Sequence, residues 1–257
     1  MVRAVQVRDD LGEPVTVPGT VTSVVSLVPS LTEAVAACDA ALLTGATKYC
    51  SHPAGLAAQR VGGTKNPHVA RITELAPDIV LANEEENRAP DLAELRDAGV
   101  AVWVTRIRTL PEALTSLGRM LTIACRLPRP PWLDVAESAW AVQQPPGAVR
   151  RAIIPIWRRP WMVLGSDTFA GDLLARIGIS NLYAGNAERY PRVELDELQG
   201  SGAELVVLPD EPYRFTRADG PEAFPGIPAA LVSGRHLTWY GPSLAEAPTV
   251  LADQLRT

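Results

Sequence analysis

The chain has 257 residues, 47% of them hydrophobic, and a formal net charge of −5 at pH 7. This length is more than one small core needs and suits two lobes of roughly 100 to 150 residues each. The negative charge argues against a nucleic-acid partner, because phosphate binding needs a basic face. No run reaches the ~18 apolar residues of a membrane span, so we expect no transmembrane segment.

The cysteines and histidines show no metal-ligand spacing. Cys38, Cys50 and Cys125 are odd in number and far apart, which indicates neither a disulfide framework nor a CxxC site. We therefore expect no metal bound by protein side chains and no intrinsic cofactor. The first residues lack the apolar core and cleavage site of a signal peptide. We expect a cytoplasmic protein as the sequence stands, and a periplasmic or extracellular one only if a signal has been removed.

The first half alternates apolar strands with helices, which is typical of a parallel sheet covered on both faces. Residues 2–8 and 14–17 predict an N-terminal hairpin. The spacing of Ser30 and Glu33 is that of a capping box, so we expect the first helix to begin there and to run through Ala37. The remaining predicted strands lie at 21–28, 42–43, 79–82 and 100–104, and the remaining helices at 69–75, 91–98 and 111–124.

The second half repeats this alternation of strands and helices. It follows a proline-rich segment and a helix predicted at 132–143, and we interpret this helix as the connector between the lobes. We expect Asp167 to cap the helix at 169–177. Further strands are predicted at 151–157, 182–183 and 205–208, and a further helix at 195–198. The predicted organisation is an N-terminal α/β lobe at 1–126, a connector at 127–147 and a C-terminal α/β lobe at 148–257.

Ligands of open α/β sheets bind outside the carboxyl ends of the strands, so the residues at those ends are the candidates for a site. The stretch Ile156–Gly165, "IWRRPWMVLG", places two tryptophans and two arginines at one such end. Aromatic rings give a large contact area at a small entropy cost, although the same tryptophans would also suit a core. The candidates are Tyr49, Lys65, Glu85, Asn87, Arg106, Trp157, Arg158, Trp161, Tyr213, Trp239 and Tyr240.

The sequence contains no GxSxG, HExxH, P-loop or GxGxxG pattern, so we expect a binding protein without catalytic residues. The alternative is a cytoplasmic enzyme or accessory factor of cofactor or specialised metabolism built on the same two lobes. Its acid and base groups would come from Glu84–Glu86 and from Asp210 and Glu211. A third possibility is an interaction module with a vestigial cleft.

Several segments in order resemble the class III substrate-binding proteins, the periplasmic-binding-protein-like receptors for corrinoids, haem and ferric siderophores. They include "VVSLVPSLTEAV", "GATKYCSHP", "VGGTKNPHVARITELAPDIVLA", "GSDTFAGDLLARIG" and "LTWYGP", and the resemblance covers residues 5 to 255 with its strongest likeness to the vitamin B12-binding branch. It implies two Rossmann-like lobes with parallel sheets, joined by a helical connector, and a bulky metal chelate as ligand, with cobalamin first and haem or a ferric siderophore next.

The resemblance also implies roles for residues. Tyr49, Trp157, Trp161 and Trp239 would form aromatic walls of an interlobe cleft, while arginine and lysine side chains would meet ligand carboxylates or phosphate and Glu85 and Asn87 would bind amides. The family's permease-docking glutamate falls at Ala70, and no tryptophan stands near Thr64, where the B12 receptors have one. Docking to an ABC permease would therefore rest on Glu74, Glu194, Asp196 and Glu197.

Overall fold

The computed structural model describes residues 3–141 and 149–256, in which the chain forms two compact units. The predicted helix at 132–143 and the predicted connector at 127–147 extend into residues outside this description. Within the described part, no helix combines the length and apolarity that crossing a bilayer requires. Unit 1 consists of Met1–Ile107, Pro111–Asp134 and Tyr240–Pro242, and unit 2 of Arg108–Leu110, Val135–Trp239 and Ser243–Thr257.

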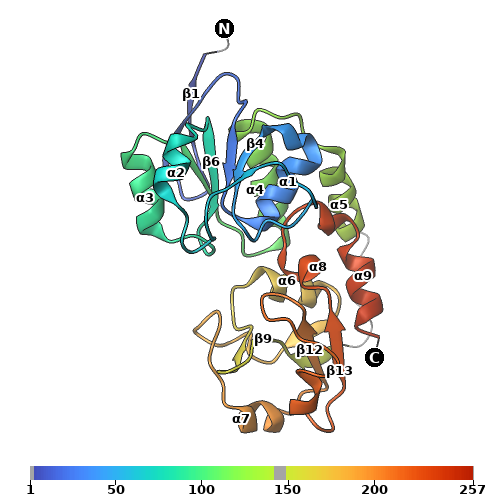
Figure 1. The fold of residues 1–257 in the computed structure, drawn as a ribbon. Coiled ribbons are helices and arrows are strands. Elements are labelled where there is room, and N and C mark those ends of the chain that lie inside the picture. Colours follow the sequence, from blue (N-terminus) through green and yellow to red (C-terminus); the bar gives the residue numbers. More distant parts are fainter. Residues whose placement is uncertain (1–2, 142–148, 257) are drawn as a thin grey trace. The chain divides into compact units, whose positions relative to one another are not determined.

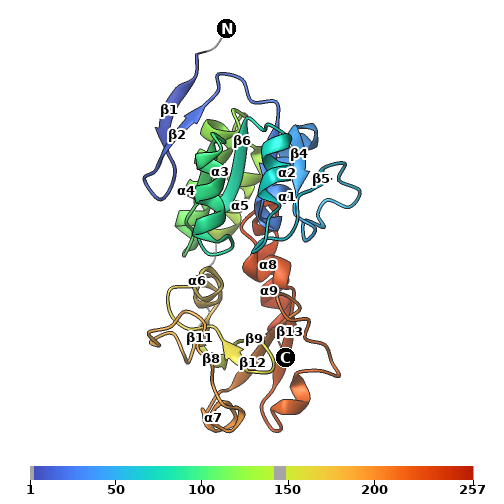
Figure 2. The same ribbon diagram turned by 60° about the vertical axis from the view of Figure 1, so that its left-hand side comes forward.

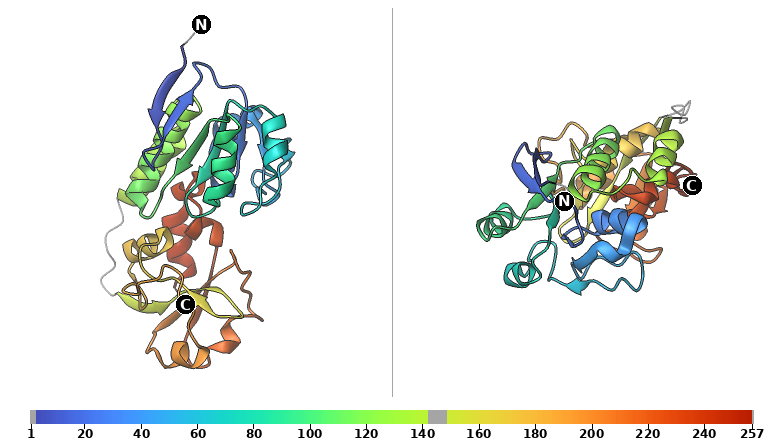
Figure 3. Two further views of the ribbon diagram at one scale, coloured as in Figure 1. Left: turned by 90° about the vertical axis from the view of Figure 1, so that its left-hand side faces the viewer. Right: turned by 90° about the horizontal axis from the view of Figure 1, so that it is seen from above.

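Unit 1 is built on a five-stranded parallel sheet with the strand order β5-β4-β3-β6-β7. Helices lie on both sides of this sheet (Figure 3), as the burial of its inner strands requires. The strands are β3 (Val24–Ser26), β4 (Leu43–Ala46), β5 (Gln59–Arg60), β6 (Ile79–Asn83) and β7 (Val102–Thr105), and the helices are α1 (Pro29–Asp39), α2 (Val69–Glu74), α3 (Ala89–Asp97), α4 (Leu110–Arg119), its π-helical continuation at Met120–Ala124, and α5 (Pro131–Ala141), which contributes residues to both units.

The core of unit 1 forms where helices α2 and α3 pack on the sheet. Ile72 of α2 and Leu92 and Leu95 of α3 join Val25 and Val80 of the central strands in one buried cluster. This burial is the energetic reason for the alternating pattern of the sequence, because each fully buried aliphatic side chain contributes about 1.5–3 kcal/mol. The sheet thereby presents the carboxyl ends of its strands on one edge.

Unit 2 (Figure 1) is built on a four-stranded parallel sheet with the order β11-β8-β12-β13, whose strands are labelled in Figure 2. A separate antiparallel pair, β9 and β10, follows β8 directly. The strands are β8 (Arg150–Ile153), β9 (Pro155–Trp157), β10 (Met162–Val163), β11 (Ile179–Asn181), β12 (Leu205–Pro209) and β13 (Ala229–Val232), and the helices are α6 (Phe169–Arg176), α7 (Leu195–Gly200), α8 (Gly234–Thr238) and α9 (Ala247–Gln254). Two α/β units with parallel sheets confirm the predicted fold class.

Four local predictions are wrong. Helix α1 begins at Pro29 with Val28 as its N-cap residue, so Ser30 lies inside the helix and forms no capping box. Asp167 has φ of 51°, which is incompatible with the extended N-cap conformation, and the adjacent Thr168 side chain accepts the capping hydrogen bond from Gly171 instead. The strand predicted at 151–157 is divided at Ile154 into β8 and β9. The strand predicted at 182–183 lies earlier in the chain, as β11.

The predicted N-terminal hairpin is confirmed as β1 (Val5–Arg8) and β2 (Pro14–Val17), and its tip covers the edge strand β7 at the side of unit 1 (Figure 2). The Asp10 N–H donates to the carbonyl of Val104 at 3.2 Å. The carboxylates of Asp9 and Asp10 accept from the backbone N–H groups of Val104 and Arg106, both at 3.2 Å. The tip thus satisfies edge groups that would otherwise remain open to another strand.

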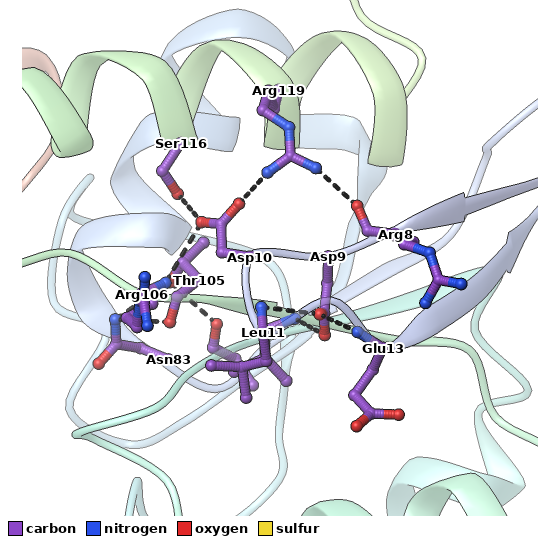
Figure 4. Close-up of polar contacts among 12 residues, drawn as sticks. Arg8, Asp9, Asp10, Leu11, Glu13, Asn83, Thr105, Arg106, Ser116 and Arg119 are labelled. Carbon is purple, nitrogen blue, oxygen red and sulfur yellow. Dashed lines mark hydrogen bonds and ion pairs between the residues drawn. The ribbon is translucent and has the colours of Figure 1, made fainter.

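Asp10 is the polar centre of this contact (Figure 4). Its carboxylate also accepts from Ser116 and pairs with Arg119, and the Arg119 guanidinium donates to the carbonyl of Arg8 at 2.6 Å. Only 9% of the Asp10 side chain is exposed. The carboxylate therefore links the hairpin to both β7 and α4.

We predict that Asp10→Asn lowers the free energy of unfolding by about 2 kcal/mol, because the half-buried Arg119 loses its charge partner. Urea denaturation of the variant measures this value. Asp97→Asn is the matched control, since Asp97 is an exposed residue at the end of α3. A loss for Asp10→Asn within 0.5 kcal/mol of the control, roughly the scatter of ordinary surface substitutions, would contradict the assignment.

Candidate functional site

Tyr49 stands on a turn that follows β4 at the carboxyl end of the unit 1 sheet. The Cys50 N–H donates to the carbonyl of Thr47 at 3.1 Å, which closes the turn. The Tyr49 side chain is 57% exposed, and the Lys48 ammonium lies 5.1 Å from its ring centroid. A Cβ placed on Gly63 would lie 3.4 Å from the ring, so this glycine forms the surface beneath it. The arrangement offers one flat aromatic face to a ligand.

The loop after β6 is held by two asparagines. Asn83 Oδ1 accepts from the N–H groups of Glu85 and Glu86 at 2.9 and 3.2 Å. Asn87 Oδ1 accepts from the Asn83 N–H at 2.9 Å, and Asn87 Nδ2 donates to the carbonyl of Thr64 at 2.9 Å. Asn87 is buried and its amide serves these internal bonds. Its predicted contact with ligand amides therefore gains no support from this geometry.

The charged candidates of unit 1 lie near the same strand ends. Lys65 Nζ donates to the carbonyl of Glu85 at 2.5 Å, which joins the loop after β5 to the loop after β6. Arg106 is exposed directly after β7. Burial, followed by the neighbouring Glu85 carboxylate, raises the pKa of Glu86. This edge therefore combines cationic side chains with a carboxyl group whose pKa is raised.

Aromatic rings gather on the β9–β10 side of unit 2. Trp161 stacks on Phe215 with centroids 6.1 Å apart and meets Phe224 edge-on at 5.2 Å. Tyr213 contacts Phe215 at 4.7 Å and the Trp157 ring at 5.7 Å. Trp161 is partly buried against the hydrophobic core, whereas Trp157 is 42% exposed. Trp157 is therefore the better placed of the two tryptophans to contact a ligand.

Arg158, predicted to meet ligand carboxylates, is already paired with carboxylates of its own unit. Its guanidinium binds Asp219 and lies 2.6 Å from Glu222 Oε1 and 5.2 Å from the Trp161 ring centroid. The Tyr213 hydroxyl donates to Asp219 Oδ2 at 2.6 Å. The charge of Arg158 is thus neutralised before any ligand arrives, and sequence reasoning named neither acidic partner.

These contacts hold both carboxyl groups in the ionised form. The hydrogen bond from Tyr213, and then the charge of Arg158, lowers the pKa of Asp219. Burial alone would raise the pKa of Glu222, but the Gly220 N–H and Arg158 together keep it below its ordinary value. Depressed pKa values stabilise the fold above the unfolded-state pKa of about 4, and this contribution is lost as pH falls through the folded-state values.

We predict that Arg158→Met raises the pKa of both carboxyl groups toward their ordinary values, and that the acid-side loss of stability becomes shallower. Carboxyl carbon NMR titration measures the pKa values directly. Tyr213→Phe is the comparison variant, and it should raise the pKa of Asp219 more than that of Glu222. Unchanged titration of both groups in Arg158→Met would refute the pairing.

The acidic side chains of the loop after β12 accept hydrogen bonds from the segment that contains α8. Asp210 Oδ1 accepts from the Gly234 N–H at 2.6 Å, and Glu211 Oε2 accepts from the indole N–H of Trp239 at 2.8 Å. Trp239 is 7% exposed. Tyr240, the next residue, belongs to unit 1. Asp210 and Glu211 thus serve as hydrogen-bond acceptors for the fold, and these contacts give no support to the acid and base roles that the alternative enzyme hypothesis requires.

One contact set in unit 2 has the composition of a Ser–His–Glu relay. Ser233 Oγ lies 2.7 Å from His236 Nδ1, and His236 Nε2 lies 2.9 Å from Glu246 Oε1. Ser233 is the N-cap residue of α8, but its side chain makes no capping hydrogen bond, and its contact with His236 joins residues three apart in the first turn. The Asp210 carboxylate occupies the Gly234 N–H, a donor that an oxyanion would need. The set joins α8 to Glu246, the N-cap residue of α9.

Comparisons with known proteins were made for sequence and for structure. No family model matches the chain. The vitamin B12-binding protein of Vibrio cholerae is 23% identical over 191 residues, which cover 68% of this chain and 66% of that protein. The chain thus spans slightly less than two thirds of the length of the curated relatives that it matches.

Solved structures cover nearly the whole chain. The periplasmic vitamin B12-binding protein BtuF of Vibrio cholerae matches with a TM-score of 0.70 at 20% identity, over 92% of this chain and 97% of that one. The periplasmic haem-binding protein RhuT of Roseiflexus matches at 0.74 and 17%, over 91% and 97%, and CeuE of Helicobacter pylori at 0.83 and 13%, over 99% and 89%. The chain has the class III substrate-binding protein fold. The resemblance that its sequence motifs indicate is confirmed.

The class III fold places the predicted docking residues on two short helices. Glu74 ends α2, Glu194 is the N-cap residue of α7, and Asp196 and Glu197 lie in the first turn of α7. All four are exposed. The Tyr183 hydroxyl donates to Glu197 at 3.1 Å, and burial together with that carboxylate raises the pKa of Tyr183 to about 12.

Sequence reasoning also missed Arg60, which holds the turn that carries Tyr49. Its Nη1 donates to the carbonyls of Thr47 at 2.9 Å and Cys50 at 3.1 Å, which are the two ends of the Tyr49 turn. No motif signals this role, because the acceptors are backbone carbonyls. A polar residue in a two-residue edge strand is the only hint that the sequence provides.

Proposed function

We propose that this protein binds a bulky metal-chelate ligand without chemical conversion, as a substrate-binding protein of the ABC-importer type or a cytoplasmic relative of one. The observation that carries the proposal is the class III fold over nine tenths of the chain, shared with proteins named for vitamin B12 and haem binding. Cobalt or iron would arrive inside the ligand. Among the described residues, no group of three His, Cys, Asp or Glu side chains is placed to hold a metal ion.

The exposed aromatic side chains support a wide, flat ligand. Tyr49 in unit 1 stands on the turn after β4, and Trp157 in unit 2 is the last residue of β9; both keep about half of their surface exposed. Exposed aromatic rings on fixed turns suit a macrocycle, because the protein loses little entropy on binding. The remaining candidate residues, Lys65, Glu85, Arg106, Tyr213, Trp239 and Tyr240, stay proposals for the polar and apolar contacts around these rings.

The charges favour a corrinoid over haem as the first ligand to test. A corrinoid is fringed mostly by amides, whereas haem carries two propionates. The cation of Arg158 is already shared between Asp219 and Glu222, so a ligand carboxylate would gain little from it. Amides need neutral donors and acceptors, which tyrosine hydroxyls and backbone groups provide.

The test is a titration of the purified protein with cyanocobalamin, cobinamide, haemin and ferric siderophores, followed by tryptophan fluorescence. We expect quenching at micromolar concentration by a corrinoid, and weaker quenching in Tyr49→Ala and Trp157→Ala than in Tyr49→Phe and Trp157→Phe, which keep a ring. No quenching by any of the four ligand classes would refute the proposal. Tighter binding of haemin than of both corrinoids would refute the ligand preference.

The proposal has two alternative settings: a permease partner for the importer-type protein, or a cytoplasmic location for the relative. The acidic residues of α7 support docking to a basic surface, whereas Ala70 on α2 provides no charge. Cell fractionation tests the location. Co-purification with a membrane complex tests the partner, and recovery of the protein only in the soluble cytoplasmic fraction without a permease would favour the cytoplasmic relative.

A further inference from the structure

A pocket of about 570 Å³ lies at the edge strand β5 and helix α2 of unit 1. These two elements stand side by side in Figure 2. The pocket is lined by Gln59, Arg60, Arg71, Glu74 and Leu75. Two guanidinium groups therefore face a single carboxylate there. This is a local excess of positive charge on a chain whose net charge is −5.

Both guanidinium groups are held in place by backbone carbonyls. Arg71 Nη1 donates to the carbonyl of Arg60 at 3.0 Å, and Arg60 Nη1 donates to the carbonyls of Thr47 and Cys50. A guanidinium carries five N–H donors in a fixed fork, so donors remain on Nη2 and Nε of each side chain. Preordered arginines bind a carboxylate at a smaller entropy cost than freely moving ones.

Helix α7 of unit 2 is the counterpart of α2. It carries two carboxylates, Asp196 and Glu197, whereas α2 carries Arg71 and Glu74. Each helix has six residues and precedes a fully buried strand, β6 or β12, and each buries its fourth residue, Ile72 or Leu198. With these residues aligned, Arg71 corresponds to Glu197 and the preceding His68 corresponds to Glu194. At the position of Arg71 and Glu197 the two units thus present opposite charges to a partner.

We infer that the pocket formed by Gln59, Arg60, Arg71, Glu74 and Leu75 is a docking site for an acidic segment of a protein partner. A peptide segment fits the mixed lining because it supplies carboxylates for the arginines, N–H donors for Glu74 and Gln59, and apolar atoms for Leu75. The small exposed Ala70 leaves the helix surface open to such a segment. A partner that presents the same basic loop to both units would be repelled at α2 and attracted at α7.

The experiment measures the fluorescence anisotropy of a labelled hexaglutamate peptide with the purified full chain at low ionic strength. We expect saturable binding that weakens as salt is raised above about 100 mM, because the contacts are ionic. Arg71→Glu should weaken binding by about 10-fold or more, since it reverses one of two charges. Arg256→Glu is the matched control, an exposed arginine near the end of α9 paired only across one helical turn, and should change binding less than about 2-fold.

Three results would overturn the inference. The first is equal binding by wild type and Arg71→Glu, and the second is the absence of saturable binding by wild type. The third is displacement of the peptide by citrate or inorganic phosphate at an equal concentration of charge, which would indicate a small-anion site. Arg71→Gln replaces Arg71→Glu if the reversal fails to fold, which a thermal melt detects. The peptide assay needs no metal chelate, so its outcome is independent of the proposed ligand binding.

Discussion

Gly165→Ala should destabilise unit 2 by about 3 kcal/mol, because the new methyl group has no room. A Cβ at this position would lie 2.0 Å from the carbonyl oxygen of Glu188 and 2.9 Å from Pro191 Cδ. The Gly165 N–H also donates to the carbonyl of Arg189 at 2.8 Å, which holds the two segments together. The conflict is with backbone atoms, so a side-chain rotation cannot relieve it, and the segment around residues 188–191 must move away.

Gly185→Ala is the matched control, since a Cβ there meets no atom within 4 Å. Because the chain has two units, the denaturation curve should be recorded together with hydrogen exchange, which assigns the loss to one unit. We expect faster exchange in β10 and in the segment at 188–193, with β3 and β6 unchanged. A loss within 0.5 kcal/mol of that of Gly185→Ala, about the range of ordinary surface changes, would show that the close approach is not maintained in solution.

The elements that sequence analysis predicted well are those whose signal is local. Strands β6 and β12 are fully buried and, apart from Asn83 at the end of β6, apolar. Helices α2 and α7 lie within two residues of their predicted ranges. Predictions failed where a single side chain redirected the backbone. Asn181 accepts from the Tyr183 N–H at 3.0 Å and donates to the carbonyls of Leu164 and Gly165, so the strand ends there and does not continue through 182–183.

The roles of the tryptophans could not be assigned from sequence, because Trp157 and Trp161 differ by the contacts of one short antiparallel pair. Pairing of Trp157 with Met162 places Trp157 outward and leaves Trp161 in the connecting turn, where it packs on Phe215 and Phe224. The role of Arg158 likewise depends on its ion pair with Asp219, which lies 61 residues further along the chain. Such long-range partners leave no spacing signal in one sequence, whereas the fold class follows from the repeated apolar strands.

Arg60→Met should weaken binding of the proposed metal-chelate ligand by about 10-fold, although Arg60 belongs to the edge strand β5 and not to the turn that carries Tyr49. The guanidinium joins the carbonyls of Thr47 and Cys50, and Met keeps the length of the side chain while removing both bonds. Bonds from a charged donor stabilise by about 1.5–3 kcal/mol each, so the Tyr49 turn should populate open conformations. Arg60 is thus a positioning residue for Tyr49.

Alkylation of Cys50 reports on the turn without any ligand. The Cys50 thiol is 1% exposed, and the Thr32 hydroxyl donates to it at 3.0 Å, so a maleimide reaches it only when the turn opens. Peptide mapping by mass spectrometry separates this thiol from Cys38 and Cys125. We expect faster alkylation of Cys50 in Arg60→Met and no change in Arg71→Met, which removes the neighbouring guanidinium but leaves both carbonyl bonds in place.

A double-mutant cycle then separates positioning from general destabilisation. If Arg60 acts through the Tyr49 ring, Tyr49→Ala and Arg60→Met together should weaken ligand binding no more than Tyr49→Ala alone, because the ring that the turn presents is already gone. Additive losses would mean that Arg60 contributes by another route. Unchanged alkylation of Cys50 in Arg60→Met would show that the turn is held without this side chain, whatever ligand the protein binds.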